Sequence, residues 1–187
     1  MSKLAFIFPG QGAQKAGMGK DFYDNSEAAR SFFDNAQKIF DFDLKEMCFG
    51  EHEELNLTEY TQPCMVSVCL AIVQELKKRG INPDITAGLS LGEYAAVAAA
   101  GGMNELDAIK LVRRRGILMQ STVPAGEGAM AAVLGLDAKK IEEILESFEN
   151  VWIANYNCPG QIVITGLTNE VQQASLALKE AGAKRVV

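Results

Sequence analysis

The chain places a serine between two glycines at the point where a short apolar stretch gives way to an alanine-rich one. The pentad Gly88-Leu89-Ser90-Leu91-Gly92 matches the pattern G-x-S-x-G, with a strand predicted at residues 84–87 and a helix at 91–100. In a sharp strand-to-helix turn of this kind the serine is backbone-strained, and the glycines avoid collisions with strand and helix. The hydroxyl then projects beside the free N–H groups of the helix N-terminus. The alternative is a glycine-rich helix start without chemistry.

Two further segments indicate that this turn lies on a parallel sheet. Residues 4–8 form an unbroken apolar run that stops at the PGQG stretch of residues 9–12, which is typical of a parallel strand covered on both faces. A polar, mixed region follows. Residues 61–80 then show helical apolar spacing, basic residues near the end and a terminal glycine. The order strand, helix, strand predicts a parallel sheet.

A change of pattern marks a second domain from residue 123. We expect strands at residues 129–136, 151–155, 162–165 and 184–187, with helices that begin near Asp137 and Thr168. The order β-α-β-β-α-β is the ferredoxin-like arrangement. The sequence therefore predicts an α/β protein with two domains, residues 1–122 and a small ferredoxin-like domain at 123–187.

Composition narrows the class of protein. Apolar residues make up 48% of the 187 residues and charged residues 22%, which fits a globular protein. The net charge of −6, without a Lys/Arg-rich block, argues against nucleic acid as a partner. No apolar run approaches the roughly 18 residues of a membrane span, so we expect a cytoplasmic protein that does not enter a membrane. The four cysteines have no CxxC pair and no neighbouring histidine, which indicates neither a metal site nor a disulfide framework.

If Ser90 is a nucleophile, its reaction intermediate needs two hydrogen-bond donors for the oxyanion. One is naturally the N–H of Leu91, directly after the serine. The other must come from a loop at the same sheet edge, and residues 9–12 form such a loop, whose glycines let backbone N–H groups approach a ligand. An ordinary strand-to-loop turn is the alternative for this segment.

The arginine run at residues 113–115 divides between two environments. A helical projection places Arg114 on the polar side and Arg115 among Ala108, Leu111 and Met119. Burial of a guanidinium is costly unless a carboxylate meets it, and no acidic residue lies one helical turn from Arg115. A substrate carboxylate held in a two-point fork is one possible partner. The alternatives are a side chain that reaches solvent or pairs with a distant acidic residue.

A serine nucleophile also needs a base, which is usually histidine. The one histidine of the chain, His52, lies in an acid-rich stretch at residues 51–54. We therefore expect His52 to be a surface residue, although its position before Ser90 does not exclude a catalytic role.

Taken together, these segments resemble the malonyl-CoA:acyl carrier protein transacylases of fatty acid synthesis and the related acyltransferase domains of polyketide synthases. The residues that carry the resemblance are FPGQGAQKAGMG at 8–19, TQP at 61–63, GLSLGEYAA at 88–96, RRRGILMQ at 113–120, VPAGEGAMAAVLGL at 123–136, NYNCPGQIVITG at 155–166 and AGAKRVV at 181–187. They are spread over the whole chain.

The resemblance implies an α/β-hydrolase-like parallel-sheet domain with an inserted ferredoxin-like small domain. It also implies a ping-pong cycle, without a permanently bound cofactor, in which Ser90 takes malonyl from malonyl-CoA and passes it to the phosphopantetheine thiol of acyl carrier protein. By position, Gln11 and Leu91 would supply the oxyanion N–H groups, and Arg115 would hold the malonyl carboxylate. Further pocket or coenzyme-side positions, each with a structural or surface role as the alternative, are Gln62, Asn157, Gln161 and Arg185.

The chain departs from the family at two places. Position 89, usually histidine, is Leu89, which removes a polar neighbour of Ser90; we expect activity to survive. The catalytic histidine of the family and the rest of its large domain follow the last strand of the small domain. We therefore expect an N-terminal portion with an incomplete sheet, a missing C-terminal portion as a possible partner, and malonyl transfer slowed by about 10² to 10⁴ without the base.

Leu91 after the nucleophile resembles the malonyl-preferring members of the family. A second hypothesis is a non-enzymatic module that binds acyl carrier protein or its own missing half. A third is a serine esterase, which Arg115 disfavours because a carboxylate clamp suits a charged acyl group.

Overall fold

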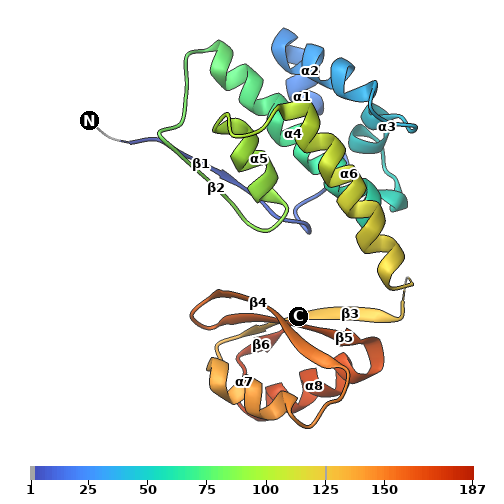
Figure 1. Cartoon of the computed structure of the whole chain (residues 1–187), viewed down its shortest axis with the longest axis vertical. Coiled ribbons are helices and arrows are strands. Elements are labelled where there is room, and N and C mark those ends of the chain that lie inside the picture. The colour runs from blue at the N-terminus through green and yellow to red at the C-terminus, as the bar shows by residue number, and fades with distance from the viewer. Residues whose placement is uncertain (1–2, 125) are drawn as a thin grey trace. The chain divides into compact units, whose positions relative to one another are not determined.

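The computed structural model describes residues 3–124 and 126–187. The chain divides into two compact units, Met1–Thr122 and Val123–Val187 (Figure 1). The elements of the first unit are, in chain order, β1 (Ala5–Phe8), α1 (Lys20–Asn25), α2 (Glu27–Gln37), α3 (Leu44–Phe49), the 3₁₀ helix η1 (Glu53–Asn56), α4 (Thr58–Lys78), β2 (Ile85–Gly88), α5 (Gly92–Ala99) and α6 (Glu105–Thr122).

Strands β1 and β2 pair in parallel, as the strand, helix, strand order predicted. The register runs from Ala5 opposite Ile85 to Phe8 opposite Gly88. Strand β2 begins one residue later than expected; just before it, the Asp84 side chain accepts the N–H of Leu4 over 2.8 Å, and the Asp84 N–H donates to Leu4 O over 2.8 Å. The carboxyl ends of both strands therefore lie side by side, which brings the loops that follow them together.

One face of this two-stranded sheet is bare among the described residues. Ile7 is 78% exposed, and Ala5, Ile85 and Ala87 are exposed on the same face. The sequence predicted a strand covered on both faces, but the core of the unit lies on the opposite face, where Phe6 and Phe8 point. The described residues do not supply the cover that the apolar run of residues 4–8 predicts for this second face.

The region described from sequence as polar and mixed contains three helices, α1 to α3. Its buried positions in α2, Ala29, Phe32, Phe33 and Ala36, follow the i, i+3, i+4, i+7 spacing of a helix with one apolar face. Ser26 caps this helix by accepting the Ala29 N–H over 3.0 Å. A helical signal was therefore present in the sequence and was missed.

Helices α4 and α6 cross at very short range. A Cβ at Gly116 would lie 2.8 Å from Thr58 O and 2.9 Å from Glu59 Cα, so only glycine fits at this point of α6. Pro63 lies inside α4 and has no N–H to donate to the Glu59 carbonyl one turn earlier. Arg113 Nη1 donates to that carbonyl over 2.8 Å. The crossing therefore fixes α6 by a steric contact and by a hydrogen bond that α4 cannot make for itself.

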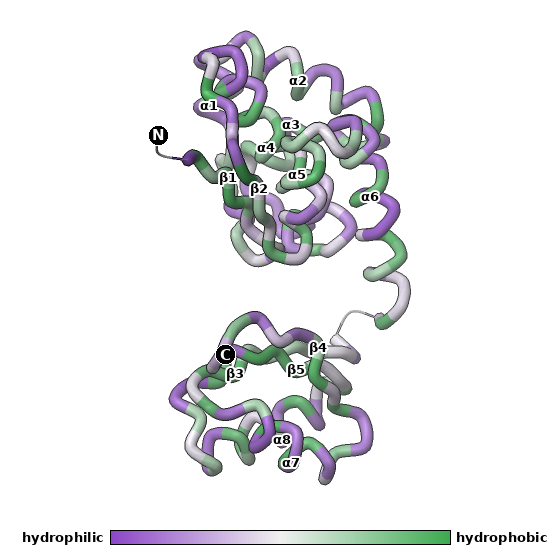
Figure 2. The backbone as a smooth tube through the Cα atoms, turned by 60° about the vertical axis from the view of Figure 1, so that its left-hand side comes forward, coloured by the Kyte–Doolittle hydropathy of each residue, from purple (hydrophilic) through white to green (hydrophobic). Residues whose placement is uncertain are grey.

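The second unit has the ferredoxin-like arrangement that the sequence predicted. Its elements are β3 (Gly128–Leu134), α7 (Ala138–Leu145), β4 (Val151–Cys158), β5 (Gln161–Leu167), α8 (Thr168–Glu180) and β6 (Arg185–Val186). The strand order is β4-β5-β3-β6, with antiparallel neighbours. The buried residues of the sheet and of α7 and α8 form one core, and Figure 2 shows the apolar residues of β3 and β5 in green.

None of the helices in the described ranges combines the length and the apolar character that a bilayer crossing requires.

We predict that Gly116→Ala lowers the free energy of unfolding by about 1–3 kcal/mol, because the added methyl group has no room against the α4 backbone. Chemical denaturation measures this change. Arg114→Ala, on the exposed face of the same helix, is the matched control and should stay within about 0.5 kcal/mol. Equal stability of the two variants would contradict the close crossing.

Candidate active site

Ser90 lies in the turn between β2 and α5 with its backbone in the left-handed region. Its φ is 50°, and no other residue except glycine has a positive φ in the part of the chain that the structure describes. A residue with a side chain adopts this conformation at a cost of about 1–2 kcal/mol, and such strain concentrates at functional sites. Ser90 is also exposed, so its hydroxyl is accessible to a reactant.

Gly88 and Gly92 permit this turn because neither position has room for a side chain. A Cβ at Gly88 would overlap the backbone of Gly92, and a Cβ at Gly92 would overlap the backbone at Phe8. Helix α5 then begins at once, since Glu93 N donates to Ser90 O over 3.1 Å. The steric role expected for the two glycines is confirmed.

The loop after β1 lies directly against the serine turn. Leu89 N donates to Phe8 O over 3.1 Å, and a Cβ at Gly10 would lie 2.9 Å from Leu89 O. The N–H groups of Gln11 and Leu91 have no acceptor among the described residues. Two N–H groups without an acceptor therefore occur within the serine turn and in the loop packed against it.

Side-chain contacts fix the position of Gln11. Its Nε2 donates to Thr58 Oγ1 over 3.1 Å, and its Oε1 accepts from Gln62 Nε2 over 3.4 Å. Gln62 is fully buried in α4 and also contacts Met119 Sδ at 3.3 Å. Its Oε1 has no hydrogen-bond partner within the described residues. Gln62 therefore supports the Gln11 loop from inside the unit.

Thr58 and Gln120 belong to this arrangement, although no sequence pattern pointed to a role for them. Thr58 N donates to Gln120 Oε1 over 2.9 Å, while the Thr58 hydroxyl meets Gln11. The three residues come from a loop, the start of α4 and the end of α6. Because single polar residues in distant segments carry no local pattern, the sequence alone offered no signal for them.

Arg115 of α6 lies over the ring of Tyr94 in α5, with 5.6 Å between Cζ and the ring centroid. Of the apolar neighbours expected around it, Ala108 is fully buried, whereas Leu111 and Met119 are 44% and 47% exposed; Arg115 itself is half-buried. The cost of burying the guanidinium is therefore partial. The other part of the expectation holds, because no carboxylate of the described residues makes an ion pair with Arg115.

Arg113 of the same run has its partners within the protein. Its Nη1 donates to the Glu59 carbonyl over 2.8 Å and lies 3.3 Å from the Glu59 carboxylate, and its Nη2 lies 3.4 Å from Asp41. Its Cζ lies 5.1 Å from the ring centroids of both Phe42 and Tyr60. Arg113 is therefore structural. Arg115 differs from it, because its guanidinium makes no ion pair within the described residues.

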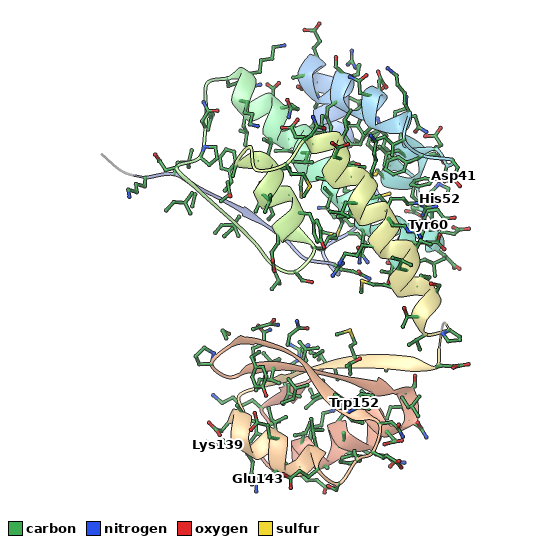
Figure 3. The ribbon with its side chains drawn as sticks, viewed as in Figure 1. Asp41, His52, Tyr60, Lys139, Glu143 and Trp152 are labelled. Carbon is green, nitrogen blue, oxygen red and sulfur yellow. The ribbon has the colours of Figure 1, made fainter. Side chains whose placement is uncertain are left out.

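His52 lies in the segment between α3 and η1, where it pairs with an acidic neighbour. Its Nε2 lies 3.1 Å from Glu46 Oε1. Figure 3 shows it on the side of the unit that also carries Asp41 and Tyr60. These contacts agree with the expectation of a surface residue.

Three of the expected site residues lie in the second unit, and the structure describes them within that unit. Gln161 and Arg185 both pair with Leu134, so they flank it on one face of the sheet. Asn157 is exposed and falls at an irregularity of β4 between Tyr156 and Cys158. Bulges of this kind redirect a side chain and recur near functional sites.

Cys48 and Cys69 are poor competitors for the role of nucleophile. Burial raises the pKa of Cys69 to about 11. Hydrogen bonding to Cys64, together with burial, raises the pKa of Cys48, and only Cys158 is exposed. A thiol with a raised pKa stays protonated and unreactive near neutral pH. No cluster of three His, Cys, Asp or Glu side chains that could hold a metal ion occurs in the described ranges.

Comparison with known proteins gives one consistent result. Residues 5–187 match the family model described as acyl transferase domain. The malonyl CoA-acyl carrier protein transacylases of Bacillus subtilis (strain 168) and Staphylococcus aureus (strain MSSA476) are 47% and 45% identical to the chain. The matches cover 100% of this chain but only 61% and 62% of those two proteins.

Solved structures agree in fold. The malonyl CoA-acyl carrier protein transacylase of Clostridium perfringens superposes with a TM-score of 0.89 at 43% identity, over 100% of this chain and 60% of that one. A malonyl-transacylase in complex with a type II PKS acyl-carrier protein gives 0.91 at 39% identity, over 100% and 62%. The fold class predicted from sequence, an α/β-hydrolase-like domain with a ferredoxin-like small domain, is confirmed.

We predict that Ser90→Gly is more stable than Ser90→Ala by about 1 kcal/mol, because glycine adopts the left-handed region without steric cost. Chemical denaturation of the two variants measures the difference. Ala95→Gly, inside α5, is the matched control and should lower stability, since the backbone there is helical. A glycine variant at position 90 no more stable than the alanine variant would show that the turn is not strained.

Proposed function

The chain belongs to the acyl transferase domain family, and on that premise we propose that Ser90 carries a malonyl group from malonyl-CoA to the phosphopantetheine thiol of an acyl carrier protein. The acyl group travels on the serine itself, so the cycle uses no resident cofactor. The observation that carries the proposal is the strained, exposed Ser90 with two uncommitted N–H groups beside it and an unpaired Arg115 on the adjacent helix.

The first half of the cycle forms the acyl-enzyme. Ser90 Oγ attacks the thioester carbonyl of malonyl-CoA, and the carbonyl oxygen becomes negatively charged as the new C–O bond forms. The N–H groups of Gln11 and Leu91 stabilise that charge. The C–S bond then breaks, and the proton lost by the serine ends on the sulfur of the departing coenzyme A.

The second half reverses these steps with a different thiol. The phosphopantetheine sulfur attacks the malonyl ester of Ser90, the same two N–H groups hold the oxyanion, and the serine leaves with a proton. Because both halves pass through the same tetrahedral geometry, one preorganised turn serves both.

Arg115 is proposed to make the site prefer a malonyl group over an uncharged acyl group. A malonyl group differs from an acetyl group by a terminal carboxylate, and a guanidinium binds a carboxylate through two parallel hydrogen bonds. Since Arg115 has no acidic partner among the described residues, its donors are available for this contact. Gln62, Asn157, Gln161 and Arg185 are proposed as further pocket or coenzyme-side residues.

We predict that Ser90→Ala abolishes covalent malonylation by malonyl-CoA, and that Arg115→Ala slows it about 10- to 100-fold through loss of charged hydrogen bonds. Intact-mass spectrometry of the quenched reaction measures the adduct. Arg114→Ala is the matched control and should react like the unmodified chain. Acetyl-CoA should be affected far less by Arg115→Ala, so an equal loss with both thioesters would contradict the carboxylate contact.

We further predict that His52→Gln changes the rate of acylation by less than about twofold, because His52 pairs with Glu46 and takes no part in the reaction. The same mass assay, followed over time, gives the rate. A loss of about 10²-fold or more would instead identify His52 as the general base.

A further inference from the structure

The contact between Arg115 and Tyr94 places the guanidinium next to the helix that starts at the serine turn. Tyr94 lies in the first turn of α5, and its N–H donates to Leu91 O over 3.2 Å. Its ring is half-buried and packs against the core of the first unit. Helix α5 also packs against α6. The ring is therefore a fixed surface rather than a mobile one.

A guanidinium that lies over an aromatic ring within about 6 Å is held by attraction to the ring face. Where the guanidinium lies parallel to the ring, the attraction uses its face and leaves the N–H groups at its edge to bind a carboxylate in two-point fashion. With 5.6 Å between Cζ and the ring centroid, Arg115 fits this description. Its flexible side chain would otherwise lose more conformational entropy when it meets a ligand.

Arg113 provides an internal comparison. It is held over two rings, Phe42 and Tyr60, but its donors are spent on Glu59 and Asp41. The same helix therefore carries two arginines that lie over aromatic rings, of which one pairs with acidic residues and the other has no acidic partner among the described residues. A position over an aromatic ring is therefore shared by both arginines, and the absence of an acidic partner among the described residues distinguishes Arg115.

We infer that Tyr94 is a positioning residue: its ring holds the Arg115 guanidinium so that the N–H edge receives the terminal carboxylate of the acyl group. This inference rests on the proposed function, because the carboxylate is that of malonyl-CoA. Tyr94 itself touches neither the reacting carbonyl nor the nucleophile in this scheme.

The test is calorimetric binding of malonyl-CoA and acetyl-CoA to the full chain, in a Ser90→Ala background that prevents acyl transfer. Tyr94→Leu keeps apolar bulk but removes the ring face, and should weaken malonyl-CoA binding roughly 3- to 10-fold while acetyl-CoA binding changes less than about twofold. Tyr94→Phe keeps the ring and should bind both thioesters normally. Equal losses for both thioesters in Tyr94→Leu, or a loss in Tyr94→Phe as large as in Tyr94→Leu, would overturn the inference.

Tyr60→Leu is the matched control, since it removes a ring from beneath Arg113. It should lower the stability of the chain and leave the ratio of malonyl-CoA to acetyl-CoA affinity unchanged. A change in that ratio as large as the one from Tyr94→Leu would show that the effect is a general loss of packing and would count against positioning by Tyr94.

A second measurement needs no ligand. The side-chain resonances of Arg115, in a chain with labelled arginine, should carry a ring-current shift that persists in Tyr94→Phe and disappears in Tyr94→Leu. If the shift is absent from the unmodified chain, the positioning role is wrong whatever the binding data show. If the shift is present but malonyl-CoA binds no better than acetyl-CoA, the proposed function fails while the contact itself stands.

Discussion

The site depends on a backbone conformation that side chains rarely adopt. Ser90 has a φ of 50°, and the chain can hold it there only because Gly88, Gly92 and Gly10 let three backbone segments approach without side chains between them. This close approach does two things at once. It exposes the hydroxyl at the start of α5, and it brings the loop after β1 against the serine turn, as the proposed roles of the Gln11 and Leu91 N–H groups require. The close approach of the three backbone segments therefore accounts both for the backbone strain at Ser90 and for the proposed preorganisation of the N–H groups around it.

A second constraint fixes the arginine. The missing N–H of Pro63 leaves the Glu59 carbonyl without its helical donor, and Arg113 fills that position from α6. Gly116 lets α6 approach α4 closely enough for this bond to form. With α6 anchored two residues before it, Arg115 emerges over Tyr94. The arginine run thus combines the structural residue Arg113 with Arg115, which has no acidic partner among the described residues. Because Arg113 anchors α6, it also determines where Arg115 lies.

The features predicted correctly from the sequence are those that depend on residues close together in the chain. The serine turn, the parallel pairing of β1 with β2 and the ferredoxin-like order of the second unit all follow from glycine placement and hydrophobic periodicity. Helix α2 was missed, although its apolar spacing was visible. The sequence could not predict contacts between segments that are distant in the chain. These contacts are the partners of Arg113, the hydrogen bond between Gln11 and Thr58, and the position of Arg115 over the ring of Tyr94. The helical projection showed that Arg115 shares a face with Ala108, Leu111 and Met119, but not that Ala108 is buried while the other two are largely exposed, because a projection does not show what covers a face.

The most direct test of this account is a crystal structure of the chain after reaction with a fluorophosphonate, whose phosphorus would be bonded to Ser90 Oγ and would stand in for the tetrahedral carbon. The account predicts that a phosphoryl oxygen lies about 2.7–3.1 Å from the backbone nitrogens of both Gln11 and Leu91, with φ of Ser90 still positive. A phosphoryl oxygen that points to solvent, or an adduct formed only after Ser90 has relaxed to a negative φ, would contradict it.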